Sequence, residues 1–341
     1  MIDKLMAFSI KNKLIVGLFI MGLIAWGSYS IKEIPIDAVP DITNNQVQVL
    51  TQSPTLAAQE VEQFITFPIE IAISNLPDVV EIRSISRFGL SVITVVFEED
   101  VDIYLARQLI SEQLKIAESK IPEDFGKPEL APITTGLGEV YQYIIHTTPE
   151  YDSVYSDMDL RSINDWLVIR QLAGTKGVIE VSSWGGHKKE YEVAVNPEKL
   201  KSMNLTIAQV FDALKSNNEN TGGSYIEKQY NAYFIRGEGL VKSIEDIEKI
   251  VVKTVNGIPI LIRDIAKVQF GSAPRFGAVT WNGKGEAVAG QALMLKGENS
   301  YKVVQAVKEK IERIKKTLPE GVVIEPYIDR SDLIGRAIGT V

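Results

Sequence analysis

The longest apolar stretch of the chain lies close to its N-terminus. Residues 14–29 read LIVGLFIMGLIAWGSY, and no charged residue occurs between Lys13 and Lys32. An uncharged run of about 18 residues is near the lower limit for a helix that crosses a bilayer. The run is apolar on all of its helical faces, which argues against a helix on the surface of a soluble domain. The pattern therefore predicts one membrane-spanning helix.

The residues that flank this run predict its orientation. Lys4, Lys11 and Lys13 precede it, and positive charge favours the cytoplasmic side of a membrane. Trp26 and Tyr29 lie near its far end, where amphipathic rings favour the interface. A cleaved signal peptide is the alternative, but it would have a shorter apolar run and a small-residue cleavage site. The sequence instead continues with Lys-Glu-Ile-Pro, so we expect a retained helix with a cytoplasmic N-terminus.

The segments on either side of the run have different characters. Met6, Phe8 and Ile10 occur among lysines, which fits either a short amphipathic helix on the membrane surface or a disordered lead-in. After the run, Pro35 and Pro40 forbid a continuing helix and predict an extended exit. Strand and helix patterns begin only beyond this exit.

The first part of the body has the order strand, helix, strand, strand, helix. The first strand alternates apolar and polar side chains, as a half-buried strand does. Pro68 interrupts the first helix and predicts a kink. The order β-α-β-β-α is a split βαβ unit. Its elements are expected at residues 46–52, 57–73, 79–86, 90–97 and 102–121.

A second set of similar elements is interrupted by about a hundred residues of different pattern, long enough for a small domain. The two βαβ halves on either side of the interruption are expected to form one further unit. The elements of these halves are expected at residues 140–147, 158–172 and 178–183, then at 287–295, 300–318 and 322–328.

The interruption, residues 186–272, reads as a small inserted α+β domain. Thr206 is in position to cap a helix over 206–217, and Asn256-Gly257 is a strong hairpin signal. Residues 220–223, Asn-Thr-Gly-Gly, predict a loop. The remaining elements are a short helix that begins at 197 and strands at 190–195, 233–236, 250–254, 258–262 and 266–270.

Composition excludes several kinds of site. The formal net charge is −8, which argues against nucleic acid because such binding needs a basic surface. The chain has no cysteine, so a thiolate zinc site and a disulfide framework are excluded. His146 and His187 are too few for a histidine-rich metal site. No hydrolase, P-loop, zinc-protease or dinucleotide motif occurs, and Gly185-Gly186 predicts a turn rather than a phosphate site. We therefore expect no catalytic residue and no bound cofactor.

Several long motifs carry a resemblance to a known family. They are PIDAVPDITNNQVQV, FPIEIAISNLPDVVEIRSISRFGLSVITVVFEED, TTGLGEVYQY, LRSINDW, NENTGGSYIE and LPEGVVIEPYIDRSDLI. With the element order, they resemble the N-terminal half of the heavy-metal efflux branch of the resistance-nodulation-division (RND) permeases, closest to the cobalt-zinc-cadmium type. The resemblance extends over essentially the whole chain.

The resemblance implies an α+β membrane protein with one N-terminal transmembrane helix, two ferredoxin-like split βαβ porter subdomains and an inserted α+β docking domain. It implies a homotrimer in the inner membrane, a periplasmic adaptor protein, an outer-membrane channel, contact with membrane lipid, a metal cation as substrate and proton antiport. The family's proton-relay acids lie in later helices, so this chain alone would not pump. The boundaries we expect are 1–34 for the lead-in and helix, 35–130 for the first subdomain, 131–185 with 273–330 for the second, 186–272 for the docking domain, and 331–341 for the start of a helix that re-enters the membrane.

Glu139 and Asp165 are the candidate metal ligands. Glu139 follows Gly136-Leu137-Gly138 just before a predicted strand, and Asp165 lies beside Trp166 in the predicted helix. Carboxylates suit divalent zinc or cobalt, and the resemblance implies that the second subdomain lines a substrate chamber. The alternatives are a solvated charge at the strand end for Glu139, and a cap or an ion pair within its own helix for Asp165.

Methionine content separates the candidate substrates. Soft thioether ligands select copper(I) and silver, whereas the chain has six methionines, several of them in or before the apolar run. Met294 is expected in the core, and Pro274 stands where the resemblance implies a methionine in a copper-type member. A divalent cation is therefore favoured. The alternatives are a copper or silver exporter, an RND exporter of drugs or lipids, and a tethered periplasmic binding module.

Overall fold

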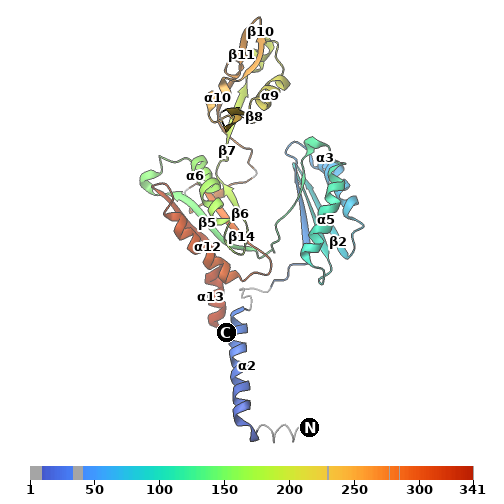
Figure 1. Cartoon of the computed structure of the whole chain (residues 1–341), viewed down its shortest axis with the longest axis vertical. Coiled ribbons are helices and arrows are strands. Elements are labelled where there is room, and N and C mark those ends of the chain that lie inside the picture. The colour runs from blue at the N-terminus through green and yellow to red at the C-terminus, as the bar shows by residue number, and fades with distance from the viewer. Residues whose placement is uncertain (1–9, 34–40, 229, 276, 284, 341) are drawn as a thin grey trace. The chain divides into compact units, whose positions relative to one another are not determined.

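The structure is a computed structural model, which describes residues 10–33, 41–228, 230–275, 277–283 and 285–340. The chain forms two compact units, and Figure 1 labels the helices and strands that build them. Unit 1 comprises Met1–Ile144, Leu167–Ser183 and Ala289–Val341, and unit 2 comprises Ile145–Trp166 and Trp184–Val288. The architecture is mixed α/β with one long apolar helix.

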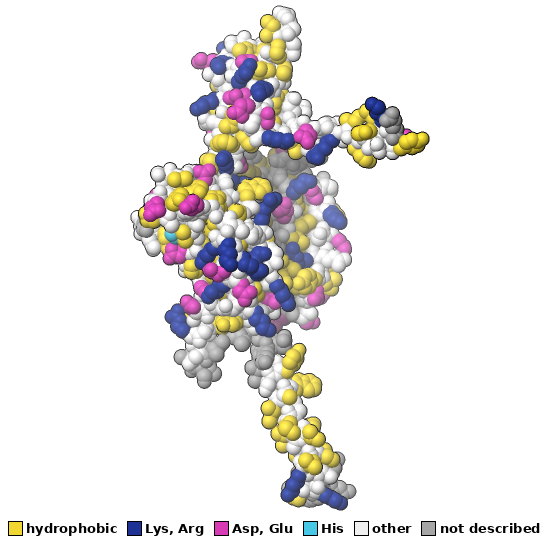
Figure 2. Space-filling model, turned by 60° about the vertical axis from the view of Figure 1, so that its left-hand side comes forward, with side chains coloured by type: hydrophobic (Ala, Val, Ile, Leu, Met, Phe, Trp, Pro, Cys, Tyr) yellow, Lys and Arg dark blue, Asp and Glu magenta, His cyan; other side chains and the backbone are white. Residues whose placement is uncertain are grey.

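Helix α2, Lys13–Glu33, is the predicted apolar helix. Its segment Lys13–Ser30 has a mean hydropathy of 1.5 and no buried residue, so its length and composition suffice for crossing a membrane. Figure 2 shows it as a column of apolar side chains with basic side chains at one end. The expectations for Met6 and Phe8, and for the exit at 35–40, lie outside the described residues.

A four-stranded sheet forms the first part of unit 1, in the order β2-β3-β1-β4. The three pairings for which a register is known, β2 with β3, β3 with β1 and β1 with β4, are all antiparallel. Val47 and Val49 are buried on one face of β1, where they pack with Ile69 and Ile110 of the covering helices. The strands are β1, Gln46–Gln52; β2, Val79–Arg87; β3, Leu90–Phe97; and β4, Pro128–Leu130; helix α5 is Ile103–Glu118.

The helix between β1 and β2 contains a π-helical turn. It consists of α3, Ala58–Val61; the π turn η1, Glu62–Thr66; and α4, Phe67–Ile73. The Phe67 N–H donates to the Glu62 carbonyl, five residues earlier. Proline has no N–H and its ring clashes with the carbonyl four residues before it, so the wider π turn accommodates Pro68. The kink predicted at this proline stays a prediction, and a π turn lies just before it.

The second sheet combines strands from distant parts of the sequence. Its order is β13-β14-β5-β15, and β6 also pairs with β14. The strands are β5, Glu139–Thr147; β6, Val178–Gly185; β13, Val279–Thr280; β14, Glu286–Met294; and β15, Val322–Asp329. The helices are α6, Asp157–Ile163; the π turn η4, Asn164–Val168; α7, Ile169–Leu172; α12, Ser300–Lys315; and α13, Arg330–Thr340. Met294 is buried, as predicted.

Unit 2 has a core of its own, built around Ile262, Ile265 and Val210. Asn256 and Gly257 have φ values of +50° and +80°, and they join two antiparallel strands, so the predicted hairpin is confirmed. The strands are β7, Lys189–Val195; β10, Val251–Val255; β11, Ile258–Leu261; and β12, Ala266–Ser272. The helices are α8, Pro197–Ser202; α9, Ile207–Ser216; α10, Ile244–Glu248; and α11, Ile262–Ile265.

The loop predicted at residues 220–223 is wrong beyond its first residue. Strand β8, Thr221–Lys228, begins there and pairs with β9, Asn231–Gly237, in an antiparallel hairpin. A Cβ on Gly223 would lie 2.6 Å from the Ile235 carbonyl oxygen, so the glycine permits close approach of the partner strand. Gly223 therefore marks a close approach of the two strands, at a point where their register shifts, rather than a loop.

Candidate functional site

Glu139 is the first residue of β5 and belongs to unit 1. Its side chain is exposed, and its Oε2 accepts a hydrogen bond from Gln142 Nε2 at 3.0 Å. This environment leaves the carboxylate accessible to a cation from solvent. It equally fits the alternative of a solvated charge at the strand end, so a role in metal binding stays a prediction.

Asp165 lies in the π turn η4 and belongs to unit 2. Arg161 Nε lies 3.1 Å from each of its carboxylate oxygens, and the two side chains are 18% and 24% exposed for Arg161 and Asp165 respectively. Asp165 therefore has an ion pair within its own helical segment, which is the alternative considered from the sequence. Because Glu139 and Asp165 belong to different compact units, their joint action on one cation also stays a prediction.

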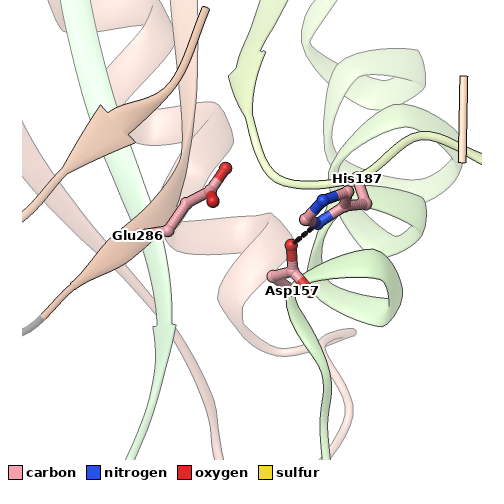
Figure 3. A group of neighbouring side chains, drawn as sticks. All are labelled: Asp157, His187 and Glu286. Carbon is pink, nitrogen blue, oxygen red and sulfur yellow. Dashed lines mark hydrogen bonds and ion pairs between the residues drawn. The ribbon is translucent and has the colours of Figure 1, made fainter. Parts of the chain in front are cut away.

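A third group of potential ligands lies within unit 2, and sequence reasoning missed it. Asp157, His187 and Glu286 each offer one ligand atom, and these atoms all lie within 4.8 Å of one another. Figure 3 shows the Glu286 carboxylate directed toward the paired side chains of His187 and Asp157. The three residues come from three separate segments of the chain, so no sequence motif joins them.

The start of α6 holds Asp157. Ser156 is the N-cap of this helix and forms a reciprocal capping box with Asp159. The hydrogen bond from the Ser156 hydroxyl holds the pKa of Asp159 below its usual value, although partial burial opposes this effect. A carboxylate that is charged at neutral pH thus stabilises the first turn, and Asp157 occupies the first helical position.

A tight turn after β6 presents His187. Gly185 and Gly186 have φ values of +68° and +63°, in the left-handed region that favours glycine. A Cβ on Gly186 would lie 2.7 Å from Val288 Cγ2, so the turn packs closely against the start of β14. The turn predicted at these glycines is confirmed, and it directs the His187 ring to Asp157, whose Oδ2 contacts the Nδ1 of that ring.

Two arginines contact this group: one neutralises the Glu286 carboxylate, and the other holds the backbone before His187. Arg275 forms an ion pair with Glu286 through its Nη1. Arg161 donates from its Nη1 to the Gly185 carbonyl at 2.6 Å, which fixes the backbone just before His187. An imidazole with two carboxylates is a donor set suited to zinc or cobalt. The only sequence signal for it was the histidine that follows the double glycine.

Comparison with known proteins agrees with the resemblance seen in the motifs. Residues 5–341 match the family described as the AcrB/AcrD/AcrF family. The chain is 43% identical over its whole length to the cobalt-zinc-cadmium resistance protein CzcA of Cupriavidus metallidurans, of which it covers 32%. It is 37% identical to the cation efflux system protein CusA of Escherichia coli strain K12, with 99% of this chain and 32% of that protein covered.

Solved structures show the same relationship. A crystal structure of a heavy metal efflux pump matches 98% of this chain and 33% of that chain, with a TM-score of 0.87 and 31% sequence identity. A second crystal form of such a pump gives a TM-score of 0.85 over 97% of this chain. The chain thus spans about a third of the length of the relatives it matches. The expected heavy-metal branch is confirmed.

Proposed function

The chain belongs to the AcrB/AcrD/AcrF family, and we propose that it is the N-terminal part of an inner-membrane permease that exports heavy-metal cations. The observation that carries this proposal is 43% identity along the whole chain to a protein named for cobalt, zinc and cadmium resistance. The apolar helix α2 supports a membrane location. In this proposal the N-terminus is cytoplasmic and the residues after about 34 are periplasmic, because lysines precede the helix.

The substrate we favour is a divalent cation such as zinc, cobalt or cadmium. Copper(I) and silver prefer sulfur ligands, and the chain offers few. Met294 is only 5% exposed and packs within the second sheet, and position 274 is a proline. Exposed carboxylates such as Glu139 are the donors that divalent cations accept.

The domain boundaries predicted from the sequence form part of the proposal. Residues 35–130 would be the first porter subdomain, 131–185 with 273–330 the second, and 186–272 an inserted docking domain. The observed order β1, helix, β2, β3, α5, β4 supports a split βαβ unit in the first segment. The pairing of β14 with both β5 and β6 supports the joining of the two later segments.

An assembly around this chain is also part of the proposal, with a homotrimer, a periplasmic adaptor and an outer-membrane channel. The β8–β9 hairpin supports an oligomer, because every described residue of both strands is exposed and it extends from unit 2 as a narrow arm (Figure 2). An isolated two-stranded hairpin is marginally stable in water, so we expect a second copy of the chain to cover its aromatic side chains.

Export would be driven by proton antiport. The uncharged stretch between Lys13 and Lys32 offers no carboxylate that could carry a proton across the membrane. Acids within a membrane are expensive and functional where they occur. We therefore assign the proton relay to other membrane helices of the full-length pump.

Metal tolerance of cells that carry the full-length pump tests the proposal. Glu139→Gln and Asp165→Asn keep the shape of each side chain and remove its charge, so we expect a partial loss of zinc and cobalt tolerance and little change for copper and silver. Glu129→Gln and Asp212→Asn, exposed carboxylates on a strand and a helix, are the matched controls. Wild-type zinc and cobalt tolerance of the double variant, at normal membrane abundance, would contradict the assignment of these ligands. Loss of tolerance to every metal would indicate a structural role instead.

A further inference from the structure

We propose that Asp157, His187 and Glu286 form a divalent-cation site of their own in unit 2, separate from Glu139 and Asp165. One imidazole and two carboxylates converge there, with ligand atoms within 4.8 Å of one another. The His187 and Asp157 side chains are 34% and 36% exposed, so a cation can reach them from solvent. Zinc and cobalt are the ions that this mixed nitrogen and oxygen donor set suits.

The geometry requires two movements: His187 Nδ1 and Asp157 Oδ2, which now contact each other directly, must separate, and the Glu286 carboxylate must come closer. Zinc bonds of about 2.0–2.2 Å in a tetrahedral arrangement put ligand atoms about 3.3–3.6 Å apart. A cation would replace the direct contact between His187 and Asp157, and rotation of the long Glu286 side chain would bring in the third ligand, since its carboxylate already points to them (Figure 3). Three protein ligands leave a fourth position for water or for a passing ligand, which is typical of an open site rather than a structural one.

The backbone that carries two of the ligands is held firmly. Asp157 lies on the capped first turn of α6. The Gly185 carbonyl, two residues before His187, accepts a hydrogen bond from Arg161. Gly186 also packs against Val288 at the start of β14, the strand that begins with Glu286. A backbone held in this way places the ligands more precisely than a free loop does.

Arg275 is the internal competitor for this cation. Its guanidinium pairs with Glu286 and the Arg275 side chain is 32% exposed, so the guanidinium can leave toward solvent when a metal takes its place. The carboxylate is thereby neutralised when no metal is bound, which avoids an unpaired charge next to Asp157. Removal of the Arg275 charge should therefore strengthen metal binding.

This inference rests on the proposed function for the source of the ion. The ion would be the exported cation, which the site would bind on the extracytoplasmic side of the membrane. Binding to the chain itself does not require export. A failure of the site would thus leave the tolerance experiment on Glu139 untouched, whereas Asp165 is connected to the site through Arg161.

Zinc titration of the full chain in detergent, with histidines labelled with ¹⁵N, tests the site. The chain has two histidines, so His146→Gln assigns the signals and serves as the matched control. We expect zinc to shift the ring signals of His187 and to leave those of His146 in place. His187→Gln and Glu286→Gln should each weaken binding at least about tenfold, because loss of even a hydrogen-bond partner of a ligand costs about 10–100-fold.

Arg275→Gln provides the outcome that misfolding cannot imitate, namely tighter zinc binding with the same His187 shift. The proposal is overturned if zinc leaves the His187 signals unchanged. It is also overturned if His187→Gln binds zinc as His146→Gln does, or if Arg275→Gln binds zinc no more tightly than the unchanged chain.

Discussion

Arg161 connects Asp165 to the backbone just before His187. Its Nε pairs with Asp165 at 3.1 Å, and its Nη1 donates to the Gly185 carbonyl at 2.6 Å. Asp165 therefore orients the arginine that holds the turn before His187. A residue chosen from the sequence as a metal ligand is connected in this way to a different group of potential ligands. The connection makes two roles for Asp165 separable by experiment.

Asp165→Asn should lower the free energy of unfolding by about 1–2 kcal/mol, between the values of exposed and buried ion pairs. If Asp165 acts only by holding Arg161, then Arg161→Gln should have the same effect and the double variant should lose little more. Urea unfolding of the three variants measures this. A metal-ligand role would instead appear as a loss of zinc tolerance in Asp165→Asn that Arg161→Gln does not reproduce.

Gly290→Ala should destabilise the second sheet. The new Cβ would overlap the ring of Tyr143, which is fully buried in the neighbouring strand β5. Overpacking of this kind costs about 1–3 kcal/mol. Thermal unfolding measures the loss, and Gly174→Ala is the control, because no heavy atom lies within 4 Å of its new Cβ. Equal midpoints for the two variants would show that the sheet adjusts without cost.

Asp329 should make the free energy of unfolding of unit 1 depend on pH in the acidic range. Partial burial tends to raise its pKa, but hydrogen bonds from Lys308, at 2.6 Å, and from the Ser331 side chain and N–H together hold the pKa below its ordinary value of 3.8. A lowered carboxyl pKa stabilises the fold above the unfolded-state value, and this contribution is lost as the pH falls through the folded-state value. Asp329→Asn should therefore cost about 2 kcal/mol at pH 6.

The cost of Asp329→Asn should shrink as the pH falls below 3.8, the ordinary value of this carboxyl. Unfolding by urea at several pH values, for the unchanged chain and the variant, measures the difference. A cost that stays constant down to strongly acidic pH would show that the Lys308 and Ser331 contacts do not depend on the charge of Asp329.

The lysines before α2 should determine the topology. A reporter that is active only in the periplasm, fused after Thr51 in β1, should be active if Lys4, Lys11 and Lys13 retain the N-terminus in the cytoplasm as proposed. Replacement of the three lysines by glutamine should reduce that activity. Activity of a cytoplasm-only reporter at the same position would reverse the orientation.

The exposed β8–β9 hairpin should contribute to assembly of the full-length pump. Phe234 is 83% exposed and its ring centroid lies 6.1 Å from that of Tyr225. Phe234→Ser should weaken the proposed trimer, as measured by mass of the detergent-solubilised full-length protein, because buried aromatic side chains dominate interface energies. Phe211→Ser, which alters an exposed aromatic on α9, is the control. An unchanged trimer in Phe234→Ser would remove the hairpin from the interface.

Elements with a clear hydrophobic period were predicted with ends close to those observed. The strand at 46–52 matches β1, and the helix at 102–121 corresponds to α5 with Asp102 as its N-cap. Periodicity reports which face of an element is buried, and both elements bury one face. The β8 strand was not predicted because its residues are exposed on both faces and include Gly222 and Gly223, which removes the alternation that indicates a strand.

The group of Asp157, His187 and Glu286 was not predicted from the sequence for a different reason. Asp157 and Glu286 lie far from it in the sequence, and their meeting depends on how the turn at Gly185-Gly186 packs against β14. The local sequence pattern carries no information on contacts between such distant residues. Glu139 and Asp165 were chosen because they stand in motifs, and their roles as metal ligands stay predictions.

The strand order of the second sheet determines when it can form during synthesis. β5 lies between β14 and β15, so it has no neighbour in this sheet until the later strands have left the ribosome. Synthesis at about 5–20 residues per second means that roughly 7–28 s pass between Thr147 and Glu286. Tyr143, Ile144 and Ile145, which are buried in the folded chain, stay exposed for that interval. The first sheet is complete by Leu130, so nascent chains that end between about residues 150 and 280 are the ones that need chaperone protection.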